Sequence, residues 1–218
     1  MPEPVTLFAV GSGITGLGAH LARRYFETAK EVVDIILGFV ALVLFLPLLG
    51  LCALIIKLSG KGPVFYTQSR VGKGGRPFRM YKLRTMYLDA ESRTGATWAK
   101  NNDPRVMPAC RWMRRSHIDE LPQLINVVVG DMSLVGPRPE RPEILAELEK
   151  VYPDIRKRLC VRPGITGLAQ VRRGYDTTIE AVRHKLEADM HYIANRKWST
   201  ELRILAATLT KFNDPGAR

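Results

Sequence analysis

The longest apolar run of the chain covers residues 32–56, where Asp34 is the only charged side chain. At about 1.5 Å of rise per residue, a helix of this length could cross a hydrocarbon core of roughly 30 Å. The run begins too late, and has the wrong flanking residues, for a cleaved signal peptide. A buried helix in a soluble core is the alternative, but such helices rarely contain so few polar side chains. We therefore predict a membrane-associated segment.

Two features indicate that this segment turns back instead of crossing. Basic residues lie on both sides of it, including Arg24 and Lys30 before the run and Lys57 after it. Because positive charge marks the cytoplasmic side of a membrane, this distribution favours two ends on one side. Pro47 removes a helical hydrogen bond near the middle and predicts a break. The pattern predicts a re-entrant helix-break-helix hairpin over residues 31–58.

The remaining hydrophobic pattern predicts short strands followed by helices. Residues 63–72 and 78–86 have strand-like composition and flank a Gly-Lys-Gly-Gly turn. Apolar side chains recur at helical spacing over 142–158, 178–197 and 199–212. The last two helices either pack in the core or lie on the membrane surface. We expect a mainly helical α+β fold, organised as an N-terminal extension (1–30), the hairpin (31–58), one folded domain (59–212) and a tail (213–218).

The N-terminal extension contains a dinucleotide-like pattern. Residues 6–10 read as a strand, and Gly11, Gly13 and Gly16 follow with G-x-G-x-x-G spacing. In a nucleotide-binding fold this turn lets a pyrophosphate approach a helix N-terminus. A second strand carrying an acidic residue should then follow, but the apolar run comes instead. A nucleotide-dependent oxidoreductase with a nicotinamide or flavin is therefore only an alternative interpretation.

Composition narrows the choice of partner. The 218 residues carry a formal net charge of +12, which favours an anionic partner such as a phosphorylated substrate, an acidic membrane face or nucleic acid. The three cysteines have no C-x-x-C spacing, so neither a disulfide framework nor a zinc site is predicted. Apart from charge, no motif favours nucleic acid, and we expect none to bind. A basic, membrane-anchored adaptor for anionic lipid or nucleic acid is a second alternative.

Candidate chemistry centres on two adjacent carboxylates, Asp119 and Glu120, just ahead of Pro122. Neighbouring residues of a helix point roughly 100° apart, so the two acids cannot share one face. One can attack while the other orients a metal or handles a proton. The local alternative is a capping box, because Ser116 stands three residues before Asp119.

Basic side chains occur on both sides of this pair. Lys82 and Arg84 are two residues apart in a predicted strand, which places them on one face as a possible phosphate clamp. A solvated basic edge strand is the competing interpretation. Arg111 and Arg115 have i,i+4 helical spacing and could serve the site or a membrane surface. Arg138 lies between Pro137 and Pro139, which restrict the backbone and present its guanidinium in a fixed position.

The strings Asp-Glu-Leu-Pro-Gln-Leu-Ile-Asn at 119–126 and Gly-Asp-Met-Ser-Leu-Val-Gly-Pro-Arg-Pro at 130–139 resemble the core signature of the bacterial sugar transferase family, the monotopic polyprenol-phosphate phosphoglycosyl transferases. Lys-x-Arg-Thr-Met at 82–86 and the stretch at 161–170 also match. The resemblance covers about residues 30–212. It departs at the break, where Leu46 precedes Pro47 and a serine is common in the family.

The resemblance implies an enzyme that transfers a sugar-1-phosphate from a UDP-sugar to polyprenol (undecaprenyl) phosphate and releases UMP. It would begin a cell-surface glycan on the cytosolic face of the cytoplasmic membrane. Asp119 would be the nucleophile and a ligand of Mg²⁺, and Glu120 the base or a metal-site partner. The implied substrate-binding residues are Lys82, Arg84, Arg114, Pro137, Arg138, Pro139, Gln170 and Arg172.

Overall fold

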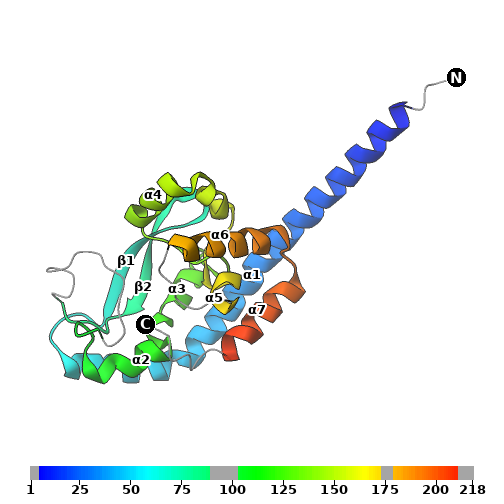
Figure 1. Cartoon of the computed structure of the whole chain (residues 1–218). Helices are drawn as coiled ribbons and strands as arrows, with labels where there is room; N and C mark the ends of the chain where they lie inside the picture. Colours follow the sequence, from blue (N-terminus) through cyan, green and yellow to red (C-terminus); the bar gives the residue numbers. More distant parts are fainter. Residues whose placement is uncertain (1–4, 89–102, 173–178, 211–218) are drawn as a thin grey trace.

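A computed structural model describes residues 5–88, 103–172 and 179–210. Figure 1 shows one very long helix beside a compact body of short helices and small sheets. The fold is mainly helical α+β, as predicted. The tail at 213–218 lies outside the described residues.

In chain order, the helices and strands of the protein are α1 (Val5–Ser59), β1 (Phe65–Val71), η1 (Lys73–Gly75), β2 (Pro77–Leu83), η2 (Pro108–Cys110), α2 (Arg111–Arg115), η3 (Ile118–Glu120), α3 (Gln123–Val128), β3 (Ser133–Val135), α4 (Pro142–Val151), η4 (Pro153–Cys160), β4 (Gly164–Thr166), α5 (Leu168–Arg172), α6 (Ile179–Ala194) and α7 (Trp198–Thr210).

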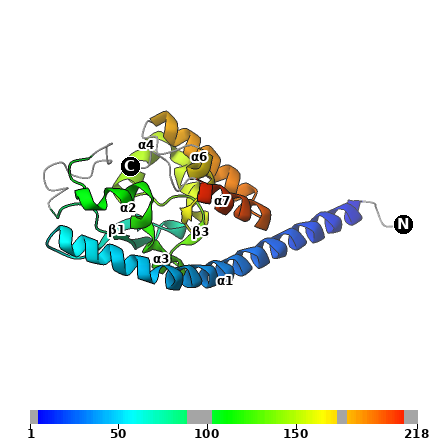
Figure 2. The ribbon, with the colours of Figure 1, turned by 90° about the horizontal axis from the view of Figure 1, so that it is seen from below.

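The helix α1 is continuous, and this corrects two predictions. Residues 6–10 are helical, so the strand of the dinucleotide pattern does not form. Pro47 lies inside the helix, so the predicted break is not present. Among the described residues, 20–59 form one helix that is long and apolar enough to cross a membrane. The N-terminal part of α1 projects beyond the body in both views (Figure 2).

Packing against the body explains how α1 continues through Pro47. On the N-terminal side of the proline, Gly38 faces α3 so closely that an added Cβ would lie 2.9 Å from Val127 Cγ1. On the other side, Cys52 and Ile56 are fully buried in a cluster with residues of η2 and α2. Both halves therefore rest on the same surface, and these contacts offset the roughly 3 kcal/mol that an internal proline costs a helix.

A polar cluster fixes the N-terminal half of α1. Lys30 Nζ lies 2.8 Å from Asp34 Oδ2 and 2.8 Å from Ser133 Oγ, and 3.1 Å from Glu201 Oε2 of α7. The Tyr192 hydroxyl of α6 lies 2.8 Å from Glu201 Oε1. These five residues, called the anchor network below, join α1, β3, α6 and α7. They explain the single acid in the apolar run, because Asp34 faces protein and is 7 % exposed.

The predicted strand pair is confirmed with shorter bounds. Strands β1 and β2 are antiparallel, with Phe65 opposite Leu83 and Val71 opposite Pro77. The connecting turn contains Gly74 and Gly75 at φ of 68° and 81°, which favour glycine. Because β2 ends at Leu83, the alternation that would place Lys82 and Arg84 on one face does not extend to Arg84.

The second sheet brings two separated motifs together. Strands β3 and β4 are parallel, pairing Ser133 with Gly164 and Val135 with Thr166. Their backbones continue in close contact, because a Cβ added to Gly164 would lie 2.0 Å from the Gly136 nitrogen. Only glycine at Gly164 permits this approach. The Gly-Pro-Arg-Pro turn therefore lies directly against the Pro-Gly turn that follows Arg162.

Candidate functional site

A left-handed residue introduces the carboxylate pair. Helix α2 ends at Arg115, and His117 then adopts φ 56° and ψ 16° before the short helix η3. This is the only positive φ at a non-glycine residue among those described, a conformation that is uncommon outside glycine and costs energy. The turn directs Asp119 and Glu120 inward, where their exposed fractions are 7 % and 9 %.

The capping interpretation of Ser116 is wrong. Its hydroxyl donates to the carbonyl oxygen of Trp112 at 2.8 Å, in the preceding helix. The first residue before η3 is His117, and no side chain caps η3 or α3. Asp119 is therefore buried without the stabilising role that a capping box would give it.

Glu120 is held by two cations. Lys82 Nζ donates to Oε1 at 2.8 Å, while Arg138 donates from Nη2 to Oε1 at 2.5 Å and from Nη1 to Oε2 at 3.1 Å. Bidentate guanidinium–carboxylate pairs of this kind are strong and directional. Burial alone would raise the pKa of Glu120, but Arg138 and Lys82 together hold it well below the usual range. The group is therefore ionised at neutral pH.

Asp119 has a different environment. No hydrogen bond or ion pair reaches its carboxylate from the described residues, although Lys82 and Arg114 are close enough to favour its charge. Burial is the largest influence, and with the neighbouring Glu120 it raises the pKa of Asp119 to about 6. A buried carboxylate with free oxygens can act as a nucleophile or a metal ligand.

The predicted cations divide into two groups. Lys82 and Arg138 meet at Glu120, and Arg114 approaches Asp119 while donating to Thr85 Oγ1 at 3.2 Å. Burial lowers the pKa of Lys82, against the opposing effect of Glu120. Arg84 is not part of this group. Its guanidinium donates to the carbonyl oxygens of Lys61 and Gly60 at 2.6 Å and 3.0 Å, where it holds the end of α1.

The remaining predicted residues lie at the edge of the site. Gln170 donates from Nε2 to the Ile165 carbonyl at 3.1 Å, which ties α5 to β4. Arg172 is exposed at the end of α5. Within the described ranges, no contact joins either side chain to Asp119 or Glu120.

The turn that carries Arg138 is held through its main chain. The Pro137 carbonyl accepts from the Gly164 N–H at 3.0 Å, and the Pro139 carbonyl accepts from Arg70 Nη1 at 3.0 Å. The Arg138 carbonyl itself accepts from Arg158 Nη2 at 2.7 Å. Burial, followed by the effect of Arg138, lowers the pKa of Arg70 to about 10. A small open pocket lies behind the turn, lined by Val71, Gly72, Pro137, Arg138, Pro139, Glu140, Leu145, Arg158, Leu159, Val161 and Pro163.

Sequence reasoning missed three residues that build the site. Asn126 is fully buried and completes the edge of β2, since it accepts from the Tyr81 N–H at 3.0 Å and donates to the Arg79 carbonyl at 2.8 Å. This contact sets Lys82 opposite Glu120. Asn126 ends the first signature string, which was a usable signal, whereas Arg70 and Arg158 belong to no motif.

The oxygen ligands that the protein offers near Asp119 fit a magnesium ion only if a substrate supplies further ligands. No group of three or more acidic, histidine or cysteine side chains suited to a metal occurs among the described residues. Mg²⁺ commonly binds one or two carboxylates and completes its shell with water and substrate phosphates. Asp119 offers free oxygens for this purpose, and a nearby cation would offset the cost of its buried charge. The residues present therefore fit a substrate-dependent Mg²⁺ site.

The fold and the site define an α+β protein in which a long apolar helix accompanies a carboxylate pair surrounded by cations. Comparison with known proteins identifies its family. Residues 25–214 match the family model of the bacterial sugar transferases, and the chain belongs to this family.

Individual relatives support the assignment. The chain is 41 % identical over 203 residues to the UDP-N-acetylgalactosamine-undecaprenyl-phosphate N-acetylgalactosaminephosphotransferase of Aeromonas hydrophila, covering 93 % of this chain and 48 % of that protein. It is 42 % identical over 194 residues to the UDP-glucose:undecaprenyl-phosphate glucose-1-phosphate transferase of Caulobacter vibrioides, covering 88 % and 72 %. It is 37 % identical over 185 residues to the exopolysaccharide production protein PSS of Rhizobium leguminosarum bv. phaseoli, covering 83 % and 92 %. The chain thus spans about half the length of the Aeromonas protein.

Proposed function

We propose that this protein is a phosphoglycosyl transferase that moves a sugar-1-phosphate from a UDP-sugar to undecaprenyl phosphate. The observation that carries the proposal is the contrast within the carboxylate pair. Glu120 is fixed by Lys82 and Arg138. The neighbouring Asp119 is also buried, but its carboxylate oxygens accept no hydrogen bond from the described residues. The named activities of the Aeromonas and Caulobacter relatives support the choice of donor and acceptor.

The reaction proceeds in two displacements at one phosphorus atom. A carboxylate oxygen of Asp119 attacks the sugar-bearing phosphorus of the donor, the bond to the bridging oxygen breaks, and UMP leaves with that oxygen. A phosphate oxygen of undecaprenyl phosphate then attacks the same phosphorus, and the Asp119 carboxylate leaves. Atoms and charge balance, and the product is undecaprenyl-diphospho-sugar.

Glu120 serves in this scheme as a holder of cations and not as the base. Because its pKa lies well below the usual range, it is a weak proton acceptor. The phosphate of the acceptor is already deprotonated near neutral pH, so the second displacement needs no strong base. Glu120 instead keeps Lys82 and Arg138 close to Asp119, where they can stabilise phosphate oxygens in the transition state.

Magnesium would be bound by Asp119 together with the donor diphosphate. When bound, it neutralises the negative charge that otherwise repels an attacking carboxylate. Arg114 also favours the charged form of Asp119 and so contributes positive charge near that carboxylate.

We further propose that the protein is monotopic and lies on the cytosolic face of the cytoplasmic membrane. Helix α1 contacts the body near Asp34 and again near Ile56, a distance of about 33 Å along the helix axis. A helix attached to one body at both points cannot cross the bilayer between them. Apolar side chains of α1 that do not pack on the body remain exposed, and α2 and α7 also carry exposed apolar side chains. The exposed apolar residues of these helices include Ile36, Phe39, Val43, Leu44, Leu51, Leu54, Trp112, Trp198, Leu202 and Leu209.

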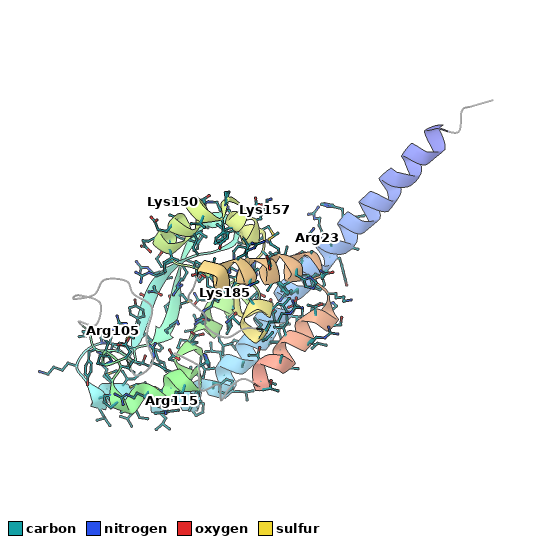
Figure 3. The ribbon with its side chains drawn as sticks, in the orientation of Figure 1. Arg23, Arg105, Arg115, Lys150, Lys157 and Lys185 are labelled. Atoms are coloured by element: carbon teal, nitrogen blue, oxygen red, sulfur yellow. The ribbon has the colours of Figure 1, made fainter. Side chains whose placement is uncertain are left out.

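The adaptor alternative would need only a basic surface and a membrane anchor. In Figure 3 the labelled basic residues come from separate elements: Arg23 lies on α1, Lys150 on α4 and Arg115 on α2. A protein that worked through a diffuse basic surface would tolerate changes at Asp119.

The decisive experiment measures a covalent intermediate. The purified protein is incubated with Mg²⁺ and a panel of UDP-sugars labelled at the sugar-bearing phosphate, without acceptor. We expect one donor to label the protein stoichiometrically and release UMP, and undecaprenyl phosphate to remove the label. Release of UMP only when both substrates are present, with no labelled protein, would instead establish a direct transfer. Absence of UMP release with every donor would favour the adaptor.

Topology is tested by cysteine labelling in intact cells. Cys160 is exposed on the catalytic body and provides an internal reference, and Thr6→Cys adds a second site on the projecting helix. A membrane-impermeant reagent should reach neither position until the membrane is opened. Labelling at position 6 alone in intact cells would show that α1 crosses the bilayer.

A further inference from the structure

The turn carrying Arg138 is held by four hydrogen bonds that come from three different parts of the chain. Its successive carbonyl oxygens, from Pro137 to Glu140, accept hydrogen bonds from the Gly164 N–H, Arg158, Arg70 and the Val71 N–H. Three of these donors belong to the strands or to the motif at 161–170. Arg158 belongs to η4, outside every signature, and its Nη2 atom donates to the carbonyl of Arg138 itself.

Arg158 is itself tightly fixed. Its side chain is 8 % exposed, and its Nη2 atom lies 2.8 Å from Asp189 Oδ2 of α6 and 2.7 Å from the Arg138 carbonyl oxygen. Its Nη1 atom lies 3.9 Å from Glu140 Oε1, in the same turn. Asp189 is 2 % exposed, which makes a charge there costly unless it has a partner. A buried ion pair with no contact to Asp119 or Glu120 thus ends on the backbone of the residue that binds Glu120.

We propose that Arg158, oriented by Asp189, is a positioning residue that sets where the Arg138 guanidinium meets Glu120 and the donor diphosphate. This inference rests on the proposed function. It connects α6 to the reacting group through one chain of contacts, from Asp189 to Arg158, to the Arg138 carbonyl, and through the Arg138 side chain to Glu120.

Two physical reasons support an arginine in this place. A planar guanidinium can contact Asp189 and the turn simultaneously in one fixed geometry, whereas a lysine ammonium is a mobile point charge. Misplacement of a substrate-binding group by about 1 Å can lower a rate by roughly a hundredfold, so a contact that only holds a backbone can still control turnover. Proline on both sides of Arg138 makes the turn stiff and transmits a shift of its carbonyl to the side chain.

The test is a double-mutant cycle on donor kinetics. We expect Arg158→Lys to lower kcat/KM for the UDP-sugar about fivefold to tenfold, mainly through KM, with little change in KM for undecaprenyl phosphate. In an Arg138→Lys background, where the bidentate fork is already lost, the same change should cost about twofold or less. A residue that merely supports the fold would give the same factor in both backgrounds.

Two further variants control for a general effect of the substitution and for a failure to fold. Arg156→Lys alters an exposed arginine of the same element, paired with Glu149, and should leave donor kinetics unchanged. Asp189→Asn keeps shape and removes the charge that orients Arg158, so it should reproduce the effect if Arg158→Lys fails to fold. Equal factors in both backgrounds, or wild-type kinetics for Arg158→Lys and Asp189→Asn, would overturn the inference. Absence of donor-dependent UMP release by the wild-type protein would instead overturn the proposed function.

Discussion

Two clusters of buried charge, built from the same kinds of residue, differ in how completely their members are partnered. In the anchor network Lys30 contacts Asp34, Ser133 and Glu201, and Tyr192 contacts Glu201. The side chains of Lys30, Asp34 and Glu201 are 4 %, 10 % and 5 % exposed. At the candidate site Lys82 and Arg138 are 19 % and 27 % exposed, and the Asp119 carboxylate has no hydrogen-bond partner among the described residues.

The difference separates a structural cluster from a reactive one. In the anchor network every charged side chain contacts a charge of opposite sign, and these contacts fix one element against another. At the candidate site the cations are partly exposed and the Asp119 carboxylate has no hydrogen-bond partner among the described residues. This arrangement costs folding free energy, but it leaves positive charge available to bind phosphate oxygens. Substitutions that treat the two clusters alike should therefore give opposite results.

The largest expected effect is on turnover at Asp119. Asp119→Asn preserves size and polarity but removes the nucleophile, so UMP release should fall about a thousandfold or more. The protein should remain folded and should bind the UDP-sugar, as measured by calorimetry. Turnover within tenfold of wild type would show that this carboxylate does not form the intermediate.

The second effect is on stability at the anchor network. Lys30→Met leaves Asp34 and Glu201 buried without their cation and should lower the free energy of unfolding by about 3–5 kcal/mol. Chemical denaturation in detergent measures this. Lys73→Met is the matched control, because Lys73 and Glu31 are 48 % and 34 % exposed at 3.7 Å and should contribute less than about 1 kcal/mol.

Catalysis sharpens the same test. At temperatures where Lys30→Met is folded, its kcat should stay near the wild-type value, because no member of the anchor network contacts the carboxylate pair. If Lys30→Met kept its stability and lost turnover, the anchor network would be the reactive cluster and not the structural one.

A smaller kinetic effect is expected at Arg138. Arg138→Lys replaces a bidentate contact with a point charge, and a loss of about 1.5–3 kcal/mol lowers kcat/KM for the donor roughly tenfold or more. Membrane partitioning should not change, because the net charge is preserved. Measuring both on one preparation separates donor binding from surface attachment, and unchanged kinetics would remove Arg138 from the site.

The smallest effect is a pH-dependent gain in stability for Asp119→Asn. Folding raises the pKa of Asp119 from 3.8 to about 6, so the folded state favours the protonated acid. That contribution is fully present below pH 4 and is lost as pH rises through about 6. With Mg²⁺ and donor absent, the variant should be more stable than wild type by about 1–3 kcal/mol at pH 8 and nearly equal to it at pH 4. A constant difference between these pH values would mean that Asp119 titrates normally.

Local sequence determined much of this protein. The glycine turn and the composition around it define β1 and β2, because positive φ values and alternating apolar residues leave few other choices. The adjacent acids and the Pro137-Arg138-Pro139 turn are likewise readable, since neighbouring residues restrict both backbone and charge. The long apolar run was recognisable as one segment for the same reason.

Tertiary structure decided the rest. Pro47 predicts a break by local rules, but packing of α1 on α3 and η2 on both sides of it keeps the helix continuous. Arg84 matches the spacing of a phosphate clamp, but the end of β2 and the carbonyls after α1 direct it elsewhere. Arg158 and Asp189, 31 positions apart in sequence, meet only because η4 and α6 pack together. Local sequence fixes what one stretch of backbone can do, whereas burial determines which distant charges must find each other, because an unpaired charge in the interior costs more than most local preferences.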